Sequence, residues 1–204
     1  MKYLYESDKI KILDRIDAIS KTINNRLLPT FDSIEKEAKE VGEKKFEDLS
    51  ARFHPDYMDE GSVYEEAFDE EVCHYLLHRE MKKEFMNSTV TWLFHLFEKD
   101  CSEIFKTNNG DNKKEELANL SIDTGTNSNW DLCNTELRLI ANVIKHGKGQ
   151  SFDKLKLRKP SVIKSSHGFI SDAEIVISVV DLNSYIIAMQ QFWNEFFEKA
   201  LQFE

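Results

Sequence analysis

Residues 136–147 bring together side chains whose types and spacing could do chemistry. At about 100° per residue of an α-helix, Arg138, Asn142 and His146 lie within roughly 80° of one another, with Lys145 beside Arg138. An imidazole exchanges protons near neutral pH, and a guanidinium offers forked donors to phosphate oxygens. We call these four residues the polar stripe, and they predict a site for a phosphate-containing ligand. The alternative is that Asn142 and His146 only satisfy backbone or loop groups at a helix end.

The residues that follow the polar stripe are basic, although the chain has a net charge of −10. Between positions 145 and 164 seven Lys or Arg residues stand against one Asp. Four of them are candidate ligand-binding residues beside Lys145, namely Lys148, Lys154, Lys156 and Arg158. Such a segment can contact phosphates locally. It can also be a solvated loop, or can pair with the acidic residues that dominate positions 31–80.

The elements that must position these residues are mostly helices, because apolar residues recur at helical spacing over long stretches. We expect helices over 12–27, 31–53, 64–105 (with a possible break at 87–89), 131–146 and 182–200, the last with Asp181 as its N-cap. We expect a long polar loop over 107–131, with one turn around 115–120. We also expect a polar extended segment over 150–166 and a short strand over 173–180. The predicted class is all-α, a bundle of five or six helices with a long polar loop and a short extended segment before the last helix. Its 204 residues predict one helical domain, with N-terminal helices over 1–60 and a core over 61–204.

The pattern Asn142-x-x-x-His146 on a helix in the C-terminal half of an all-helical chain resembles the HEPN superfamily (higher eukaryotes and prokaryotes nucleotide-binding). The segment 145–147, the polar stretch after it and the aromatic last helix are similar to those of bacterial HEPN-like proteins. The usual signature of the family also has an arginine directly before the polar residue. Here Ala141 stands at that position, and Arg138 lies one turn earlier.

The resemblance implies a metal-independent ribonuclease without a cofactor, in which the motif helices of two protomers form one cleft. It implies that His146 serves in proton transfer as a ribose 2′-hydroxyl attacks its own phosphate, and that the motif arginine steadies the charge that develops. Arg138 is the candidate to replace that arginine, and Asn142 is the polar residue of the motif. Members with an incomplete motif act as binding partners, in toxin–antitoxin or defence systems among others. Because losing one cation that stabilises a developing oxyanion costs about 10²–10³ in rate, Ala141 predicts a slow enzyme or none. The partners expected are a second copy of the chain and RNA or a nucleotide.

Two other functions compete with this one. A non-catalytic interaction or dimerisation module would use the aromatic last helix (Phe192, Trp193, Phe196 and Phe197) to bind a protein partner. A metal-dependent helical enzyme would use His74 and His78, whose i, i+4 spacing suits Zn²⁺. The sequence identifies no third ligand, so no metal site is predicted.

Composition also predicts where the protein works. Three widely spaced cysteines indicate reduced thiols in the cytoplasm. No apolar run approaches the roughly 20 residues of a membrane span, and no signal peptide is recognised at the start, so we expect no membrane partner.

Overall fold

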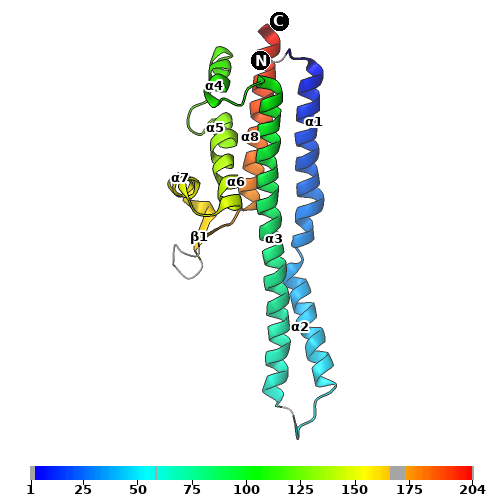
Figure 1. Ribbon diagram of the computed structural model, residues 1–204. Coiled ribbons are helices and arrows are strands. Elements are labelled where there is room, and N and C mark those ends of the chain that lie inside the picture. Colours follow the sequence, from blue (N-terminus) through cyan, green and yellow to red (C-terminus); the bar gives the residue numbers. More distant parts are fainter. Residues whose placement is uncertain (1–2, 58, 166–172, 204) are drawn as a thin grey trace. The chain divides into compact units, whose positions relative to one another are not determined.

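The structure is a computed structural model that describes residues 3–57, 59–165 and 173–203, and its class is all-α, as predicted (Figure 1). A π-helical turn over Leu132–Glu136 joins the helices Asn129–Asp131 (α5) and Leu137–His146 (α6), so these two elements form one helical run. The elements are α1 (Glu6–Thr22), α2 (Ile34–Ser50), α3 (Glu60–Phe105), α4 (Gly110–Asn119), α5 (Asn129–Asp131), α6 (Leu137–His146), α7 (Gln150–Arg158), β1 (Ile163–Ser165), β2 (Ala173–Ile175) and α8 (Val179–Ala200).

The chain forms two compact units, one of residues 1–21 with 85–204 and the other of residues 22–84. The chain passes from one unit to the other at the end of α1 and again within α3. Within the described residues, no helix is both long and apolar enough to cross a membrane.

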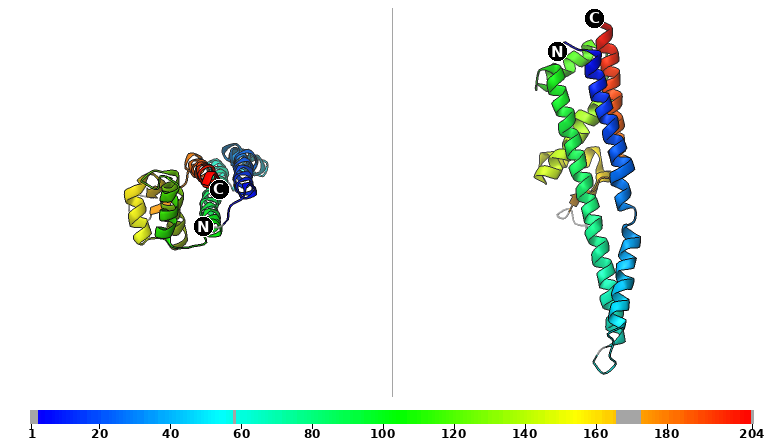
Figure 2. Two further views of the ribbon diagram at one scale, coloured as in Figure 1. Left: turned by 90° about the horizontal axis from the view of Figure 1, so that it is seen from above. Right: turned by 90° about the vertical axis from the view of Figure 1, so that its right-hand side faces the viewer.

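The core of the first unit is an aromatic cluster. In both Figure 1 and Figure 2, α1, the last part of α3 and α8 run side by side, and α4 to α7 lie to one side of α3 and α8. Trp130 of α5 packs between rings of α3 and α8, with centroids 5.8 Å from Phe97 and 5.3 Å from Phe192. Burial of large aromatic rings is among the strongest stabilising contributions in a core. These contacts fix the α5–α6 run against the two long helices.

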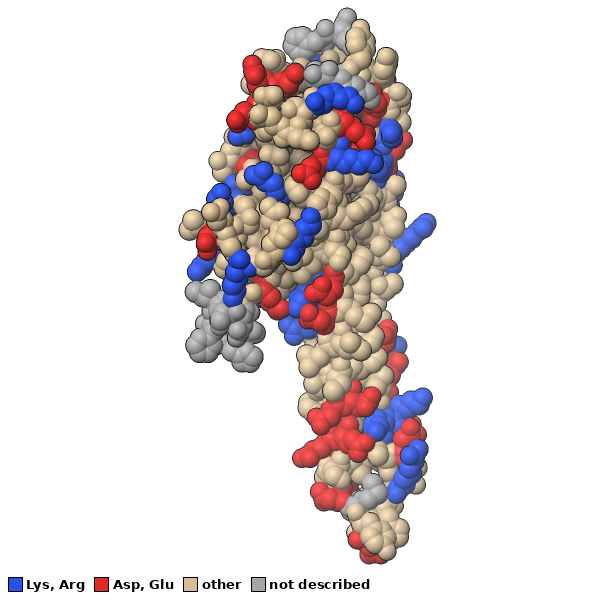
Figure 3. Space-filling model, in the orientation of Figure 1, with Lys and Arg blue, Asp and Glu red and all other residues tan. Residues whose placement is uncertain are grey.

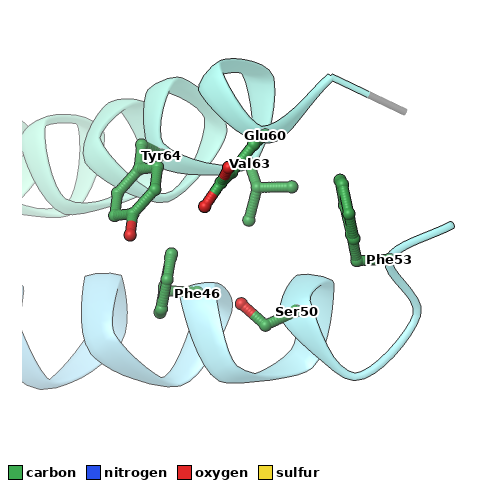
Figure 4. Close-up of a pocket in the computed structure, with 6 residues that line it drawn as sticks. All are labelled: Phe46, Ser50, Phe53, Glu60, Val63 and Tyr64. Carbon is green, nitrogen blue, oxygen red and sulfur yellow. The ribbon is translucent and has the colours of Figure 1, made fainter. Parts of the chain in front are cut away.

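The second unit is a helical hairpin of α2 and the first part of α3. A Cβ on Gly42 of α2 would lie 2.9 Å from Glu71 Cβ and 3.3 Å from the Ala67 carbonyl oxygen, so the two helices approach closely there. Nearer the connecting segment, the rings of Phe46 and Tyr64 lie 4.7 Å apart and line an apolar pocket (Figure 4). The hairpin is therefore held together at several points along its length.

Several predicted elements differ from those observed. Helix α3 has no break at 87–89. The hydroxyls of Thr89 and Thr91 donate to carbonyl oxygens one turn earlier, a contact that polar residues make within a continuous helix. The predicted loop over 107–131 contains a ten-residue helix, α4, whose N-terminus is capped by Asn109.

The prediction of an extended segment over 150–166 is wrong for its first half, which forms helix α7. Phe152 and Leu155, one turn apart, are buried and hold that helix against the core. Pro160 begins a short 3₁₀ turn, and the chain is extended only from Ile163.

The predicted strand over 173–180 is shorter than expected. Residues 173–175 form β2, which pairs antiparallel with β1 and places Ile163 opposite Ile175. Asp181 is not the N-cap of α8, because Ser178 takes that position and Asp181 is the third helical residue of a capping box. Helix α8 therefore starts at Val179, earlier than the sequence indicated.

Candidate nucleic-acid interface

Helix α6 presents the polar stripe to solvent. Its apolar residues Leu137, Leu139, Ile140, Ala141 and Val143 are buried. On the opposite side Arg138, Lys145 and His146 are exposed and Asn142 is half-buried. The predicted division of this helix into an apolar face and a narrow polar one is thus confirmed.

The stripe residues have no protein partners in the described part of the chain. There, no hydrogen bond or ion pair engages the side chains of Arg138, Asn142, Lys145 or His146. Within the described residues, Asn142 and His146 therefore do not satisfy backbone or loop groups, which was the alternative interpretation. Among the described residues, nothing competes with a ligand for the hydrogen-bonding groups of the stripe.

Gly147 ends α6 and turns the chain into α7. Its φ of 69° and ψ of −143° belong to a region that residues with a Cβ rarely adopt. Its amide donates to the Val143 carbonyl oxygen at 2.8 Å, which satisfies one of the last carbonyls of the helix. Because the next helix begins at Gln150, α7 packs directly against α6.

The predicted basic residues divide into two groups. Lys148, Lys154 and Lys156 are exposed, and Figure 3 shows Lys and Arg side chains over the region of α6 and α7. The guanidinium of Arg158 instead donates to Asp131 at 2.5 Å and to Glu136 at 3.1 Å. Arg158 therefore holds α7 to the α5–α6 run, and Lys154 and Lys156 are the exposed cations of α7 itself.

Next to Arg158, Lys159 completes a largely buried polar network that the sequence did not reveal. Its ammonium lies 3.1 Å from Glu136 Oε1, 3.0 Å from Asp181 Oδ1 and 3.0 Å from the Tyr185 hydroxyl oxygen. The Tyr185 hydroxyl donates to the same Glu136 oxygen at 2.7 Å. The acids paired with Arg158 and Lys159 thus come from the first unit and not from the acidic segment 31–80.

The protonation of this network follows from its burial. Burial raises the pKa of Tyr185 well above its usual range, and the adjacent Glu136 carboxylate raises it further, so the hydroxyl remains a donor. Burial alone would raise the pKa of Asp181. Hydrogen bonds from Ser178 and Lys159 outweigh that effect, and the net pKa lies below its ordinary value. The network therefore keeps its carboxylate–cation pairs and fixes the position of α7.

The structure also places the position at which the HEPN signature has its arginine. Ala141 is completely buried, so this position faces the core and not the polar stripe. Arg138, one turn earlier, is exposed on the same side as His146. The exposed cations that share this helix with His146 are therefore Arg138 and Lys145.

The aromatic face of α8 is not a docking surface. Phe192, Trp193, Phe196 and Phe197 are each 0% exposed and stack with one another and with rings of α3 and α5. The expectation that these four rings bury against a protein partner is wrong, because the core of the first unit already covers them.

In the helical hairpin, the sequence indicated two histidines but not the carboxylate beside them. His74 and His78 of α3 meet Glu37 of α2, and one ligand atom from each lies within 4.8 Å of the others. The i, i+4 histidine spacing was visible in the sequence, but the pairing of α2 with α3 was needed to find the carboxylate.

The three cysteines are unpaired, and burial raises the pKa of Cys101 and of Cys133, which makes both thiols unreactive.

Comparisons of the chain with protein-family models, with curated proteins and with solved structures find no match.

Proposed function

We propose that the surface formed by α6 and α7 binds a phosphate-containing ligand, an RNA strand or a nucleotide, and that His146 transfers protons there. The observation that carries the proposal is the polar stripe itself, an exposed set of donors with no side-chain partner in the described residues. The exposed Lys154 and Lys156 of α7 extend the same surface with positive charge. A cytoplasmic location, which the unpaired cysteines favour, would give it access to RNA.

The chemistry that these residues support is transesterification of RNA. The ribose 2′-oxygen attacks the adjacent phosphorus and loses its proton to an imidazole, and the bond from phosphorus to the 5′-oxygen breaks. The products are a 2′,3′-cyclic phosphate and a 5′-hydroxyl, whose oxygen takes up a proton from an acid. Arg138 and Lys145 would stabilise the charge that develops on the phosphate oxygens.

One imidazole cannot supply the base and the acid in the same step. A second copy of the stripe would supply the other group, which is why we propose a homodimer with two α6 helices facing one cleft. A monomer would bind RNA through the same surface but would cleave it slowly, if at all.

The test uses a fluorescently labelled single-stranded RNA, an excess of chelator and untagged protein. Cleavage is followed on gels and binding by fluorescence anisotropy, and light scattering gives the oligomeric state. We expect binding by the wild type and cleavage that His146→Ala abolishes. His95→Ala, which removes an exposed imidazole from α3, is the matched control. Failure to bind RNA and nucleotides at low salt would overturn the proposal, and cleavage that survives His146→Ala would remove the nuclease step.

A further inference from the structure

We propose that Glu37, His74 and His78 form a binding site for a divalent transition metal, Zn²⁺ in the first place, within the hairpin of α2 and α3. This inference does not rest on the proposed RNA-binding function, because it concerns other residues in the other compact unit.

The two histidines are arranged as ligands on one side of α3. Their rings stack with centroids 4.1 Å apart, as residues four positions apart on a helix can. His78 Nδ1 lies 3.0 Å from the backbone carbonyl oxygen of His74. A carbonyl oxygen only accepts, so Nδ1 carries the proton and Nε2 keeps its lone pair. Metal-binding histidines are commonly fixed by such a bond from their other ring nitrogen.

His74 offers a second reason to expect a ligand. Its Nε2 is inaccessible to solvent and has no hydrogen-bond partner. A buried polar nitrogen without a partner costs free energy, and native proteins usually satisfy such groups. A metal ion bound between the helices would satisfy it.

Glu37 brings the carboxylate from α2. The Ser33 hydroxyl donates a hydrogen bond to Glu37 Oε1, which orients the carboxylate as outer-shell partners do at metal sites. The position of α2 is fixed by its close approach to α3 at Gly42 and by the ion pair of Lys45 with Glu66 at 2.7 Å. The third ligand is thus held by the packing of the hairpin.

The separations suit a small cation after a modest adjustment. Ligands about 2.0–2.2 Å from Zn²⁺ at tetrahedral angles lie about 3.4 Å apart. The ligand atoms here lie within 4.8 Å of one another. The required movement of roughly 1.4 Å at most is within reach of the Glu37 side chain, which is exposed and can shift by that amount without disturbing the core.

The donor set indicates the class of metal. Two imidazoles and one carboxylate suit Zn²⁺ and Fe²⁺, whereas Mg²⁺ prefers oxygen ligands alone. Three protein ligands leave at least one position for water, which is the arrangement of catalytic and not of structural zinc sites. The partly exposed cluster allows water to reach that position.

Isothermal titration of the metal-free, untagged protein with Zn²⁺, and separately with Mg²⁺, tests the site. We expect one Zn²⁺ per chain and no measurable Mg²⁺ binding. Substitution with Co²⁺ should give the strong visible absorption of a four-coordinate site. His74→Ala and Glu37→Gln should each weaken Zn²⁺ binding by more than the roughly 10- to 100-fold that loss of an outer-shell partner costs.

The control is His95→Ala, which removes an imidazole outside the cluster and should leave Zn²⁺ affinity unchanged. Circular dichroism checks that each variant is folded, and Glu37 is exposed, so Glu37→Gln should fold as the wild type does. Absence of stoichiometric Zn²⁺ binding by the wild type would overturn the proposal. Equal binding by wild type, His74→Ala and Glu37→Gln would overturn it as well. The RNA assay contains chelator, so failure of one proposal leaves the other unaffected.

Discussion

Glu136 is the residue on which the buried network of the first unit depends. Its carboxylate is 8% exposed and accepts from Arg158, Lys159 and Tyr185. A buried ion pair adds little net stability compared with apolar packing, but removing one partner leaves charges without compensation. The network therefore matters more for where it places α7 than for the stability it adds.

The first prediction concerns that carboxylate. Glu136→Ala should lower the free energy of unfolding by about 3–5 kcal/mol, because it breaks two largely buried ion pairs at once. Arg158 and Lys159 each keep one other carboxylate partner, Asp131 and Asp181 respectively. Tyr185→Phe should lower it by a smaller amount, about 1.5–3 kcal/mol. It removes the hydroxyl that donates to Glu136 and accepts from Lys159, but those two charged groups still pair with each other. Urea denaturation measures both. Glu115→Ala, at an exposed position of α4, is the control and should change stability by no more than about 0.5 kcal/mol. A Glu136→Ala protein as stable as this control would contradict the role given to the network.

The second prediction concerns the pH dependence of Asp181. Its pKa in the folded protein lies below the ordinary value of 3.8. The unfolded chain thus binds the proton more tightly, and stability rises with pH across the interval between the two pKa values. The contribution of Asp181 is fully present above its unfolded pKa and is lost as pH falls through its folded pKa.

Asp181→Asn removes this titration and isolates it from the other carboxylates. Urea unfolding at a series of pH values should show the wild type more stable than Asp181→Asn at pH 6. The difference should shrink below pH of about 4, where the carboxylate begins to protonate. A difference that stays constant down to the lowest pH at which the protein is folded would show that the charge of Asp181 contributes nothing.

At the scale of elements, the junction between α6 and α7 decides whether the polar stripe and the exposed lysines share one surface. Gly147 makes that junction with a φ of 69°, and among the described residues no side chain or more distant backbone lies within 4 Å of where its Cβ would be. The cost of a side chain there is therefore one of backbone strain and not of collision.

Gly147→Ala should destabilise the protein by roughly 1–3 kcal/mol, the cost of holding a residue with a Cβ in a sparsely populated backbone region. Gly110→Ala is the matched control, because Gly110 is a helical residue with open space around it and without a positive φ. That variant should be neutral or gain about 0.4–1 kcal/mol. Thermal unfolding of the two variants compares them directly, and equal midpoints would contradict the argument from φ.

The long amphipathic helices could be predicted from sequence because many apolar residues at helical spacing reinforce one another, as along α8 and in the α5–α6 run. Helix α7 could not, because its only large apolar residues are Phe152, Leu155 and the exposed Leu157, and the two leucines alternate with lysines instead of following helical spacing. The cap of α8 was misassigned by three residues, since Ser178 and Asp181 are both good capping residues and only the hydrogen bonds distinguish them.

The candidate site also has features that sequence spacing predicts and features that it does not. The polar stripe lies on one helix, so its angles follow from helical geometry alone. The network joins Glu136, Arg158 and Tyr185 across 49 positions, and the metal cluster joins Glu37 to His78 across two helices. Such contacts depend on how helices pack, which the spacing of residues along one helix does not specify.

At the scale of the whole molecule, charge is distributed by unit. The chain has a net charge of −10, and its acidic stretch 31–80 lies entirely in the second unit. The basic residues of α6 and α7 lie in the first unit. An acidic protein can therefore bind RNA only through a local surface, and that binding must depend on salt.

The last prediction uses this dependence to count the contacts. If Arg138, Lys145, Lys154 and Lys156 each neutralise one phosphate, the logarithm of the RNA association constant should fall with the logarithm of salt concentration with a slope of about −2.8. Lys154→Gln combined with Lys156→Gln should reduce the slope to about −1.4.

The double variant Lys11→Gln, Lys114→Gln changes net charge equally at exposed positions on α1 and α4, and should keep the wild-type slope. Anisotropy titrations across a range of salt concentrations provide the measurement. Equal slopes for the two double variants would mean that α7 does not contact the phosphates, and that whatever RNA affinity exists arises elsewhere on the protein.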